Sequence, residues 1–108
     1  MRKSSRIYGN THPVDLNVCT YCGDPIDNFS RTVDHLIPES RGGIRANKNK
    51  VPSCKSCNQL KDDMTPEEFD LNLGRMIRLV QSDNRRQIQR LKKIRINVAK
   101  IIRSRHNE

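Results

Sequence analysis

The chain has 108 residues, of which 33% are hydrophobic and 4% aromatic, and its formal net charge is +9. A hydrophobic core this small is marginal by burial alone, so a structural metal is expected to supplement it. No apolar run is long enough for a membrane span, and the basic N-terminus leads into no apolar signal region. The chain is therefore expected to stay in a reducing cytoplasm.

Residues 1–17 are expected to form an irregular N-terminal arm. The segment Cys19–Gly23 predicts a tight knuckle, because glycine at its end suits the left-handed conformation that closes such a turn. Tyr21 and Phe29 are expected to pack in the small core.

Residues 31–37 are the best strand candidate, and Pro38 is expected to end that strand. Residues 38–48 predict a loop containing Gly42 and Gly43. Residues 50–52 predict a short return strand that pairs antiparallel with the first, and Pro52 is expected to keep it short.

Three helical segments are expected after the hairpin. A short helix should run through Asn58 to Lys61, and a longer one should begin at Thr65, where the Thr-Pro-Glu-Glu sequence forms a capping box. Residues 82–84 predict a break, after which apolar residues recur at helical spacing to near Arg103.

Four cysteines form two pairs with the spacing of metal ligands, namely Cys19 with Cys22 and Cys54 with Cys57. In a reducing compartment two CxxC pairs indicate a tetrahedral zinc site rather than disulfides. Four thiolates leave no open coordination position, so the zinc is expected to be structural. The gap of 31 residues between the pairs is longer than in a compact zinc ribbon, and it contains Asp34-His35.

The positive charge lies entirely in the last third of the chain. Residues 75–108 contain 11 Lys and Arg against 2 Asp and Glu, whereas residues 1–74 contain 10 of each kind. This asymmetry favours a nucleic-acid partner, and a solvated helix face is the alternative. The apolar stripe of the same segment could pack on the core or pair with a second copy. We favour packing together with DNA contact, and a homodimer through this helix is left open.

Asp34, His35, Asn49 and Asn58 supply the chemical groups that phosphodiester hydrolysis needs. A neutral imidazole can deprotonate the attacking water. Carboxylate and carboxamide oxygens are ligands that Mg²⁺ accepts. A further polar group can fix the tautomer and direction of the imidazole.

The ordered motifs Cys-x-Tyr-Cys-Gly, Asp-His-x-Ile-Pro-x-Ser-Arg-Gly-Gly, Asn-Lys-Val-Pro-Ser-Cys-x-x-Cys-Asn-x-x-Lys and Thr-Pro-Glu-Glu-Phe closely resemble the HNH endonuclease family, over Cys19 to about Phe69. The resemblance implies a small α+β fold with a ββα-metal core, stapled by a four-cysteine structural zinc site. Together with the composition and charge of the two ends, the resemblance leads us to expect an arm (1–17), a nuclease domain (18–74) and a basic helical extension (75–108).

The resemblance also implies a role for each motif residue. His35 is similar to the general base, and Asp34 matches the carboxylate that ligates the catalytic Mg²⁺. Asn49 matches the residue that steadies the hairpin loop and orients the histidine. Asn58 stands where many members have His, and at this position Asn resembles a metal ligand that favours Mg²⁺ or Mn²⁺.

Eight cations are candidates for binding DNA phosphates: Arg41, Arg45, Lys61, Arg85, Arg86, Arg90, Lys92 and Lys93. For Arg41 and Arg45 loop solubility is an equal alternative, and for Lys61 a solvated helix lysine is the alternative.

The leading prediction is a metal-dependent endonuclease that hydrolyses DNA. The alternatives are a non-catalytic zinc-ribbon protein that binds nucleic acid, and an HNH-derived accessory subunit of a phage or mobile element. The Asp34-His35 pair together with Asn58 favours the nuclease, because a pure binding module has no need of these residues.

Overall fold

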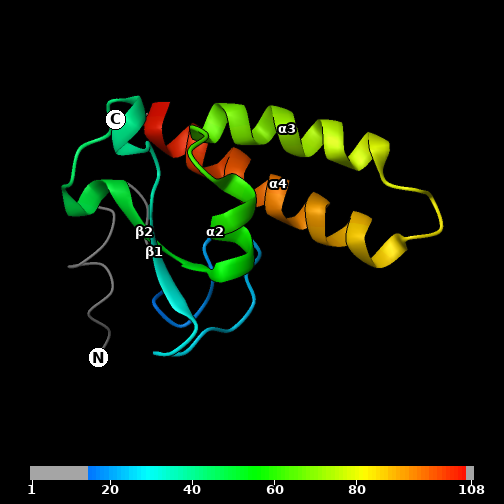
Figure 1. Cartoon of the computed structure of the whole chain (residues 1–108), viewed down its shortest axis with the longest axis horizontal. Coiled ribbons are helices and arrows are strands. Elements are labelled where there is room, and N and C mark those ends of the chain that lie inside the picture. The colour runs from blue at the N-terminus through cyan, green and yellow to red at the C-terminus, as the bar shows by residue number, and fades with distance from the viewer. Residues whose placement is uncertain (1–14, 107–108) are drawn as a thin grey trace.

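The computed structural model describes residues 15–106, so most of the expected arm lies outside the described residues. An antiparallel two-stranded sheet is formed by β1 (Arg31–His35) and β2 (Lys50–Cys54), and three helices follow: α2 (Lys55–Lys61), α3 (Pro66–Leu79) and α4 (Arg85–His106). Figure 1 shows α2 against the hairpin, and α3 and α4 side by side as a helical pair. The expected small α+β fold is confirmed.

The hairpin has the predicted pairing, with His35 opposite Lys50 and Arg31 opposite Cys54. β2 is longer than expected, because it continues through Pro52 to Cys54. Proline is tolerated there because neither strand has a neighbour on its outer edge within the described sheet, and the Pro52 carbonyl accepts a hydrogen bond from the Thr20 amide at 3.0 Å. Between the strands lie two 3₁₀ turns, η1 (Glu39–Arg41) and η2 (Asn47–Asn49).

The helix boundaries follow local signals in the sequence. The Thr65 hydroxyl accepts a hydrogen bond from the Glu68 amide, and the Glu68 carboxylate accepts one from the Thr65 amide, so the predicted capping box is confirmed. The predicted break is confirmed as well, because α3 ends at Leu79 and α4 begins at Arg85.

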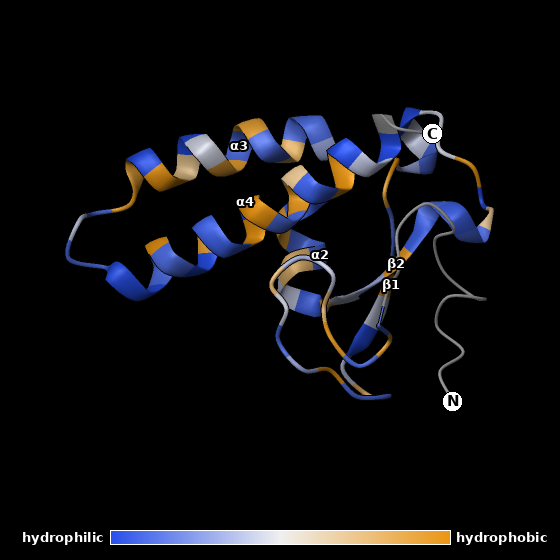
Figure 2. Ribbon diagram, turned by 180° about the vertical axis from the view of Figure 1, so that it is seen from behind, coloured by the Kyte–Doolittle hydropathy of each residue, from blue (hydrophilic) through white to orange (hydrophobic). Residues whose placement is uncertain are grey.

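A single cluster of buried residues joins the cysteine knuckles to α3 and α4. Leu91, Ile94, Val98 and Ile101 of α4 are buried in the same cluster as Cys19, Tyr21, Phe69 and Leu73. The hydropathy colouring of Figure 2 shows this pattern as orange and blue segments that alternate along α4. The expected packing of the apolar stripe is confirmed, and the stripe suggested for a homodimer is buried within this chain. The predicted boundary at residue 74 falls inside α3, where Gly74 is buried.

Two further findings concern exposure. Tyr21 is buried and meets Phe69 edge to face, with ring centroids 5.6 Å apart, as expected for a core residue. The expectation for Phe29 is wrong, because its side chain is 91% exposed in the turn before β1. Within residues 15–106, no helix has both the length and the apolar character needed to cross a membrane.

Candidate active site and metal centre

The four cysteines come together at one point, although 31 residues separate the two pairs. Their sulfur atoms lie within 4.8 Å of one another, and the Sγ atoms of Cys22 and Cys54 are 3.9 Å apart. Four ligands at about 2.3 Å around a tetrahedral zinc ion would be about 3.8 Å from each other. The cluster therefore fits a closed zinc–tetrathiolate site, and it agrees with the structural zinc expected from the spacing.

The local backbone turns the sulfur atoms inward. Gly23 has a φ of 80°, the left-handed conformation predicted for the end of the first knuckle. Amide groups donate to the sulfurs in both knuckles, from Cys22 to Cys19 at 3.5 Å and from Cys57 to Cys54 at 3.4 Å. A hydrogen bond with Cys57 lowers the pKa of Cys19 to about 4, whereas burial raises the pKa of Cys22 to about 11.

His35 is the last residue of β1, and its side chain is 30% exposed. Its Nε2 atom lies 3.8 Å from Oε2 of Glu39, and the same oxygen accepts a hydrogen bond from Nε of Arg45 at 3.1 Å. Sequence reasoning missed Glu39. Only the position of the η1 turn brings its carboxylate back toward the imidazole.

Asn49 fastens the loop that follows His35. Its Oδ1 accepts a hydrogen bond from the Ile37 amide at 2.9 Å, and its Nδ2 donates to the carbonyls of Ile37 at 2.9 Å and Ile44 at 2.8 Å. The loop is tight, because a Cβ on Gly43 would lie 1.7 Å from the Ile37 carbonyl oxygen. One buried carboxamide therefore holds the loop that begins two residues after His35.

Asp34 points to the opposite side of the strand from His35, as the alternation of a β-strand requires. Its carboxylate is buried, and Oδ2 accepts hydrogen bonds from the Tyr21 hydroxyl and from Nζ of Lys61, the latter at 3.1 Å. Burial raises the pKa of Asp34 and lowers that of Lys61, and the ion pair opposes both shifts.

Lys61 differs from both interpretations of its sequence position. Its side chain is 0% exposed, and its ammonium group also donates to the His35 carbonyl at 2.9 Å. A buried ammonium that is paired with Asp34 is neither a phosphate contact nor a solvated helix lysine.

Asn58 lies on the face of α2 that packs on β1, one turn before Lys61. Its Nδ2 donates to the Thr32 hydroxyl at 3.1 Å, and the residue borders an open hollow of about 350 Å³. Thr32 and Asp34 share one face of β1, so Asn58 and Asp34 both lie at the interface between α2 and β1.

Asp34 and Asn58 have the donor chemistry for a hard divalent cation. Mg²⁺ commonly binds to one or two carboxylates, with water and substrate phosphate completing its octahedron. Both hydrogen bonds to Asp34 use Oδ2, and the contact of Asn58 uses Nδ2. Among the described residues, these contacts leave the Oδ1 atoms of both side chains unengaged.

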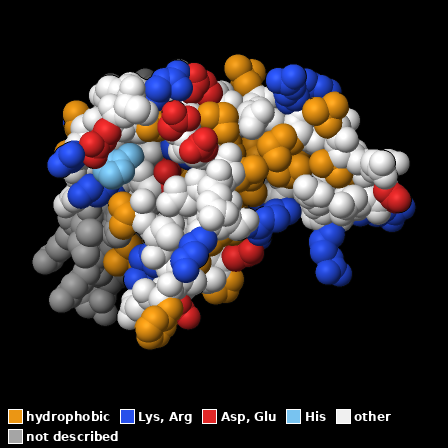
Figure 3. All heavy atoms as spheres, in the orientation of Figure 1, with side chains coloured by type: hydrophobic (Ala, Val, Ile, Leu, Met, Phe, Trp, Pro, Cys, Tyr) orange, Lys and Arg blue, Asp and Glu red, His pale blue; other side chains and the backbone are white. Residues whose placement is uncertain are grey.

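Most of the predicted DNA-binding cations are paired with acidic groups of the chain itself. Arg41 donates to Glu68 at 2.7 Å, Arg45 pairs with Glu39, and Arg90 and Lys93 lie 3.0 and 3.7 Å from the carboxylate of Asp24. Arg85, Arg86 and Lys92 on α4 are exposed as well, and no ion pair within residues 15–106 engages them. On the face of the molecule that Figure 3 shows, Lys and Arg are spread out rather than gathered in one patch.

A second cationic feature was missed by the sequence reasoning. Lys48 and Arg105 line a cleft of about 240 Å³ beside Ile37 and Asn49, where the C-terminal end of α4 meets the loop after His35. Figure 1 shows this end of α4 close to that loop. No local pattern marks Arg105, because its position depends on how α4 packs.

The chain was compared with known proteins. A model of the HNH endonuclease family matches residues 19–73. The CRISPR-associated endonuclease Cas9 of Corynebacterium diphtheriae is 39% identical over 44 residues, which cover 40% of this chain and 4% of that protein. The crystal structure of the Type II-C Cas9 enzyme from Actinomyces naeslundii is similar over 91% of this chain and 11% of that chain, with 19% identity and a TM-score of 0.44.

The chain thus spans a small fraction of the length of both proteins. The family model is the stronger finding, because it covers half of the chain and includes the four cysteines, the Asp34-His35 pair, Asn49 and Asn58. This chain therefore belongs to the HNH endonuclease family.

Proposed function

We propose that the protein is a metal-dependent endonuclease that hydrolyses phosphodiester bonds in DNA. The observation that carries the proposal is the arrangement of the motif residues on the hairpin of a chain from this family. His35 is partly exposed at the end of β1, and Asp34 and Asn58 lie at the neighbouring interface between β1 and α2. Family membership alone supports nuclease chemistry, whereas the residue roles below are proposals.

His35 acts as the general base. Its imidazole removes a proton from the attacking water, a step that in enzymes typically contributes about 10²- to 10⁴-fold to the rate. Asn49 is a positioning residue, because it fixes the backbone directly after His35. Glu39, 3.8 Å from Nε2, is the acidic group nearest to the proton that the imidazole acquires.

Asp34 and Asn58 would hold a Mg²⁺ or Mn²⁺ ion through their Oδ1 atoms. Such an ion supplies charge neutralisation at the scissile phosphate and at the leaving oxygen. Tyr21 and Lys61 hold Oδ2 of the Asp34 carboxylate from the core side, and this fixes the orientation of the other oxygen, Oδ1. The zinc ion held by the four cysteines takes no part in the chemistry, because its coordination is closed.

DNA is expected to lie against the end of the hairpin loop and α4. Lys48 and Arg105 flank the cleft beside this loop, and Arg85, Arg86 and Lys92 are exposed on α4. Contacts of this kind neutralise phosphates and are independent of sequence. Arg41 and Arg45 would have to exchange Glu68 and Glu39 for phosphate oxygens.

One observation favours the second candidate, a non-catalytic zinc protein that binds nucleic acid. The Asp34 carboxylate is already neutralised by Lys61, which weakens its attraction for a second cation. The two candidates differ in whether any bond is broken.

Incubation of zinc-containing protein with supercoiled plasmid tests the proposal. Nicked or linear DNA should form in Mg²⁺ or Mn²⁺, and no cleavage should occur with EDTA or with Asn58→Ala. Asn72→Ala, a change on α3 away from the hairpin, is the control and should cut as the wild type does. Binding without cleavage in either metal would favour the second candidate.

A further inference from the structure

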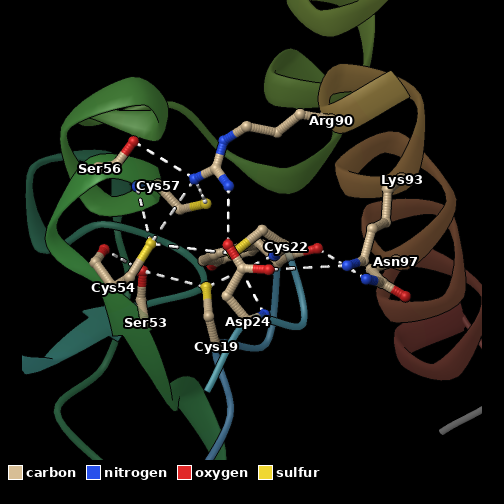
Figure 4. Close-up of polar contacts among 11 residues, drawn as sticks. Cys19, Cys22, Asp24, Ser53, Cys54, Ser56, Cys57, Arg90, Lys93 and Asn97 are labelled. Carbon is tan, nitrogen blue, oxygen red and sulfur yellow. Dashed lines mark hydrogen bonds and ion pairs between the residues drawn. The ribbon is translucent and has the colours of Figure 1, made fainter. Parts of the chain in front are cut away.

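Arg90 of α4 reaches the cysteine cluster from outside. Its guanidinium group lies 3.6 Å from Sγ of Cys57 and 3.9 Å from Sγ of Cys54. The same group donates to Oδ2 of Asp24 at 3.0 Å and to Ser56 at 3.4 Å. Figure 4 shows the side chain extending from α4 to the point where both knuckles meet.

The charge of a zinc–tetrathiolate centre explains what this contact does. Four thiolates around one Zn²⁺ ion leave roughly two excess negative charges on the centre. An arginine cannot lose its proton in a protein, and its planar group can donate to several acceptors at once. Arg90 is 36% exposed, so its attraction to the sulfurs is only partly screened by solvent.

Two neighbours on the same face of α4 contact the first knuckle. Lys93 lies 3.7 Å from Oδ1 of Asp24, and Nδ2 of Asn97 donates to the Tyr21 carbonyl at 2.7 Å. Residues 90, 93 and 97 are spaced by three and four, so one helical face carries all three contacts. Among them, Arg90 alone contacts sulfur in the described structure.

We propose that Arg90 is the charge partner of the zinc–thiolate centre and thereby couples metal retention to the docking of α4. This inference rests on the proposed zinc site and is independent of the nuclease activity. Groups that donate to a metal's ligands change its affinity by about 10- to 100-fold when they are removed. The positive guanidinium offsets the negative charge of the zinc–thiolate centre, and so it disfavours the loss of the ion.

The experiment compares Arg90→Gln and Arg90→Lys with Arg86→Gln. Arg86 is exposed on the same helix and borders the same hollow as Cys22, but among the described residues it makes no hydrogen bond to a sulfur. Arg86→Gln therefore removes the same charge without removing a contact to the thiolates. One measurement is the rate of zinc transfer to a chromophoric chelator. The other is the sulfur-to-metal charge-transfer band of the Co²⁺-substituted protein, which reports directly on hydrogen bonds to the thiolates.

Arg90→Gln should release zinc about 10- to 100-fold faster than the wild type and should shift the cobalt band. Arg90→Lys keeps the positive charge but loses the planar guanidinium, so its zinc release rate should lie between those of the wild type and Arg90→Gln. Arg86→Gln should release zinc at the wild-type rate. Should Arg90→Gln not fold, the comparison of Arg90→Lys with Arg86→Gln carries the same test.

Zinc release and a cobalt band that are the same in Arg90→Gln as in Arg86→Gln would overturn this inference alone. A wild-type protein that binds neither zinc nor cobalt would overturn the zinc assignment and this inference with it. A wild-type protein that holds zinc but cuts no DNA would count against the proposed nuclease function and leave this inference standing.

Discussion

Lys61 and Asp34 form an ion pair inside the protein, where each charge depends on the other. Lys61 is 0% exposed and the Asp34 side chain 6% exposed. Removing one partner leaves an uncompensated buried charge, which typically costs about 3–5 kcal/mol. Replacing both residues by neutral ones leaves no buried charge without a partner.

Lys61→Met should therefore lower the free energy of unfolding of the zinc-containing protein by about 3–5 kcal/mol in urea denaturation. The double variant Lys61→Met with Asp34→Asn should recover a substantial part of that loss. If the two single changes and the double change were strictly additive, the two residues would not be acting as a pair.

The side chain of Asn49 alone provides hydrogen bonds to three backbone groups of the loop after His35. Asn49→Ala would leave the Ile37 amide and two carbonyls without these bonds. A buried group left unsatisfied costs about 1–3 kcal/mol, so stability should fall by at least that amount and the cleavage rate should fall with the loss of loop order. Asn47→Ala, an exposed change in the same 3₁₀ turn, is the control and should alter neither quantity.

At the scale of elements, the sequence predicted those features that depend on near neighbours. The capping box at Thr65, the left-handed Gly23 and the pairing of the hairpin each rest on a few adjacent residues, and each is confirmed. The burial expected for Phe29 is wrong, and the environments of Lys61 and Arg90 were not predicted. The environments of these two cations depend on which helix face meets which part of the chain, and a lysine in a helix carries no local sign of a carboxylate on β1.

The same distinction holds for the candidate site. The residue types at positions 34, 35, 49 and 58 could be chosen from the sequence, because chemistry restricts them. Glu39 and Arg105 could not, because the turn after β1 and the end of α4 bring them beside the hairpin only in the folded chain.

Removal of α4 should unfold the protein. Its four buried apolar side chains each contribute about 1.5–3 kcal/mol, which in total is comparable with the 5–15 kcal/mol of a small domain. A chain ending at residue 84 should lack a cooperative thermal transition even with zinc. A folded truncated chain with only weaker DNA binding would contradict this prediction and would support the sequence-based view of the last third as an appended extension.

Charge reversal on the exposed face of α4 separates DNA binding from folding. Lys92→Glu and Arg86→Glu should weaken DNA binding and flatten its dependence on salt, because fewer counterions are released. Thermal stability should be nearly unchanged. Arg78→Glu on α3 is the control for charge, and equal weakening there would indicate a general charge effect instead of contact with this face.

At the scale of the whole molecule, the cysteine cluster and the core are one unit. Cys19, Cys22 and Cys57 belong to the buried cluster that also contains Phe69 and Ile94. Zinc removal should therefore abolish the cooperative thermal transition, and added zinc, but not Mg²⁺, should restore it. Circular dichroism with a strong chelator measures this, and an unchanged transition in metal-free protein would contradict it.

The most direct test of the account compares His35→Ala with the wild type in plasmid cleavage, with DNA affinity measured on the same samples. His35 lies on the surface side of β1 and contributes no side chain to the core. The variant should keep its zinc, its fold and its DNA affinity, while cleavage should slow by about 10²- to 10⁴-fold. Cleavage by the variant at the wild-type rate would contradict the assignment of His35 as the general base.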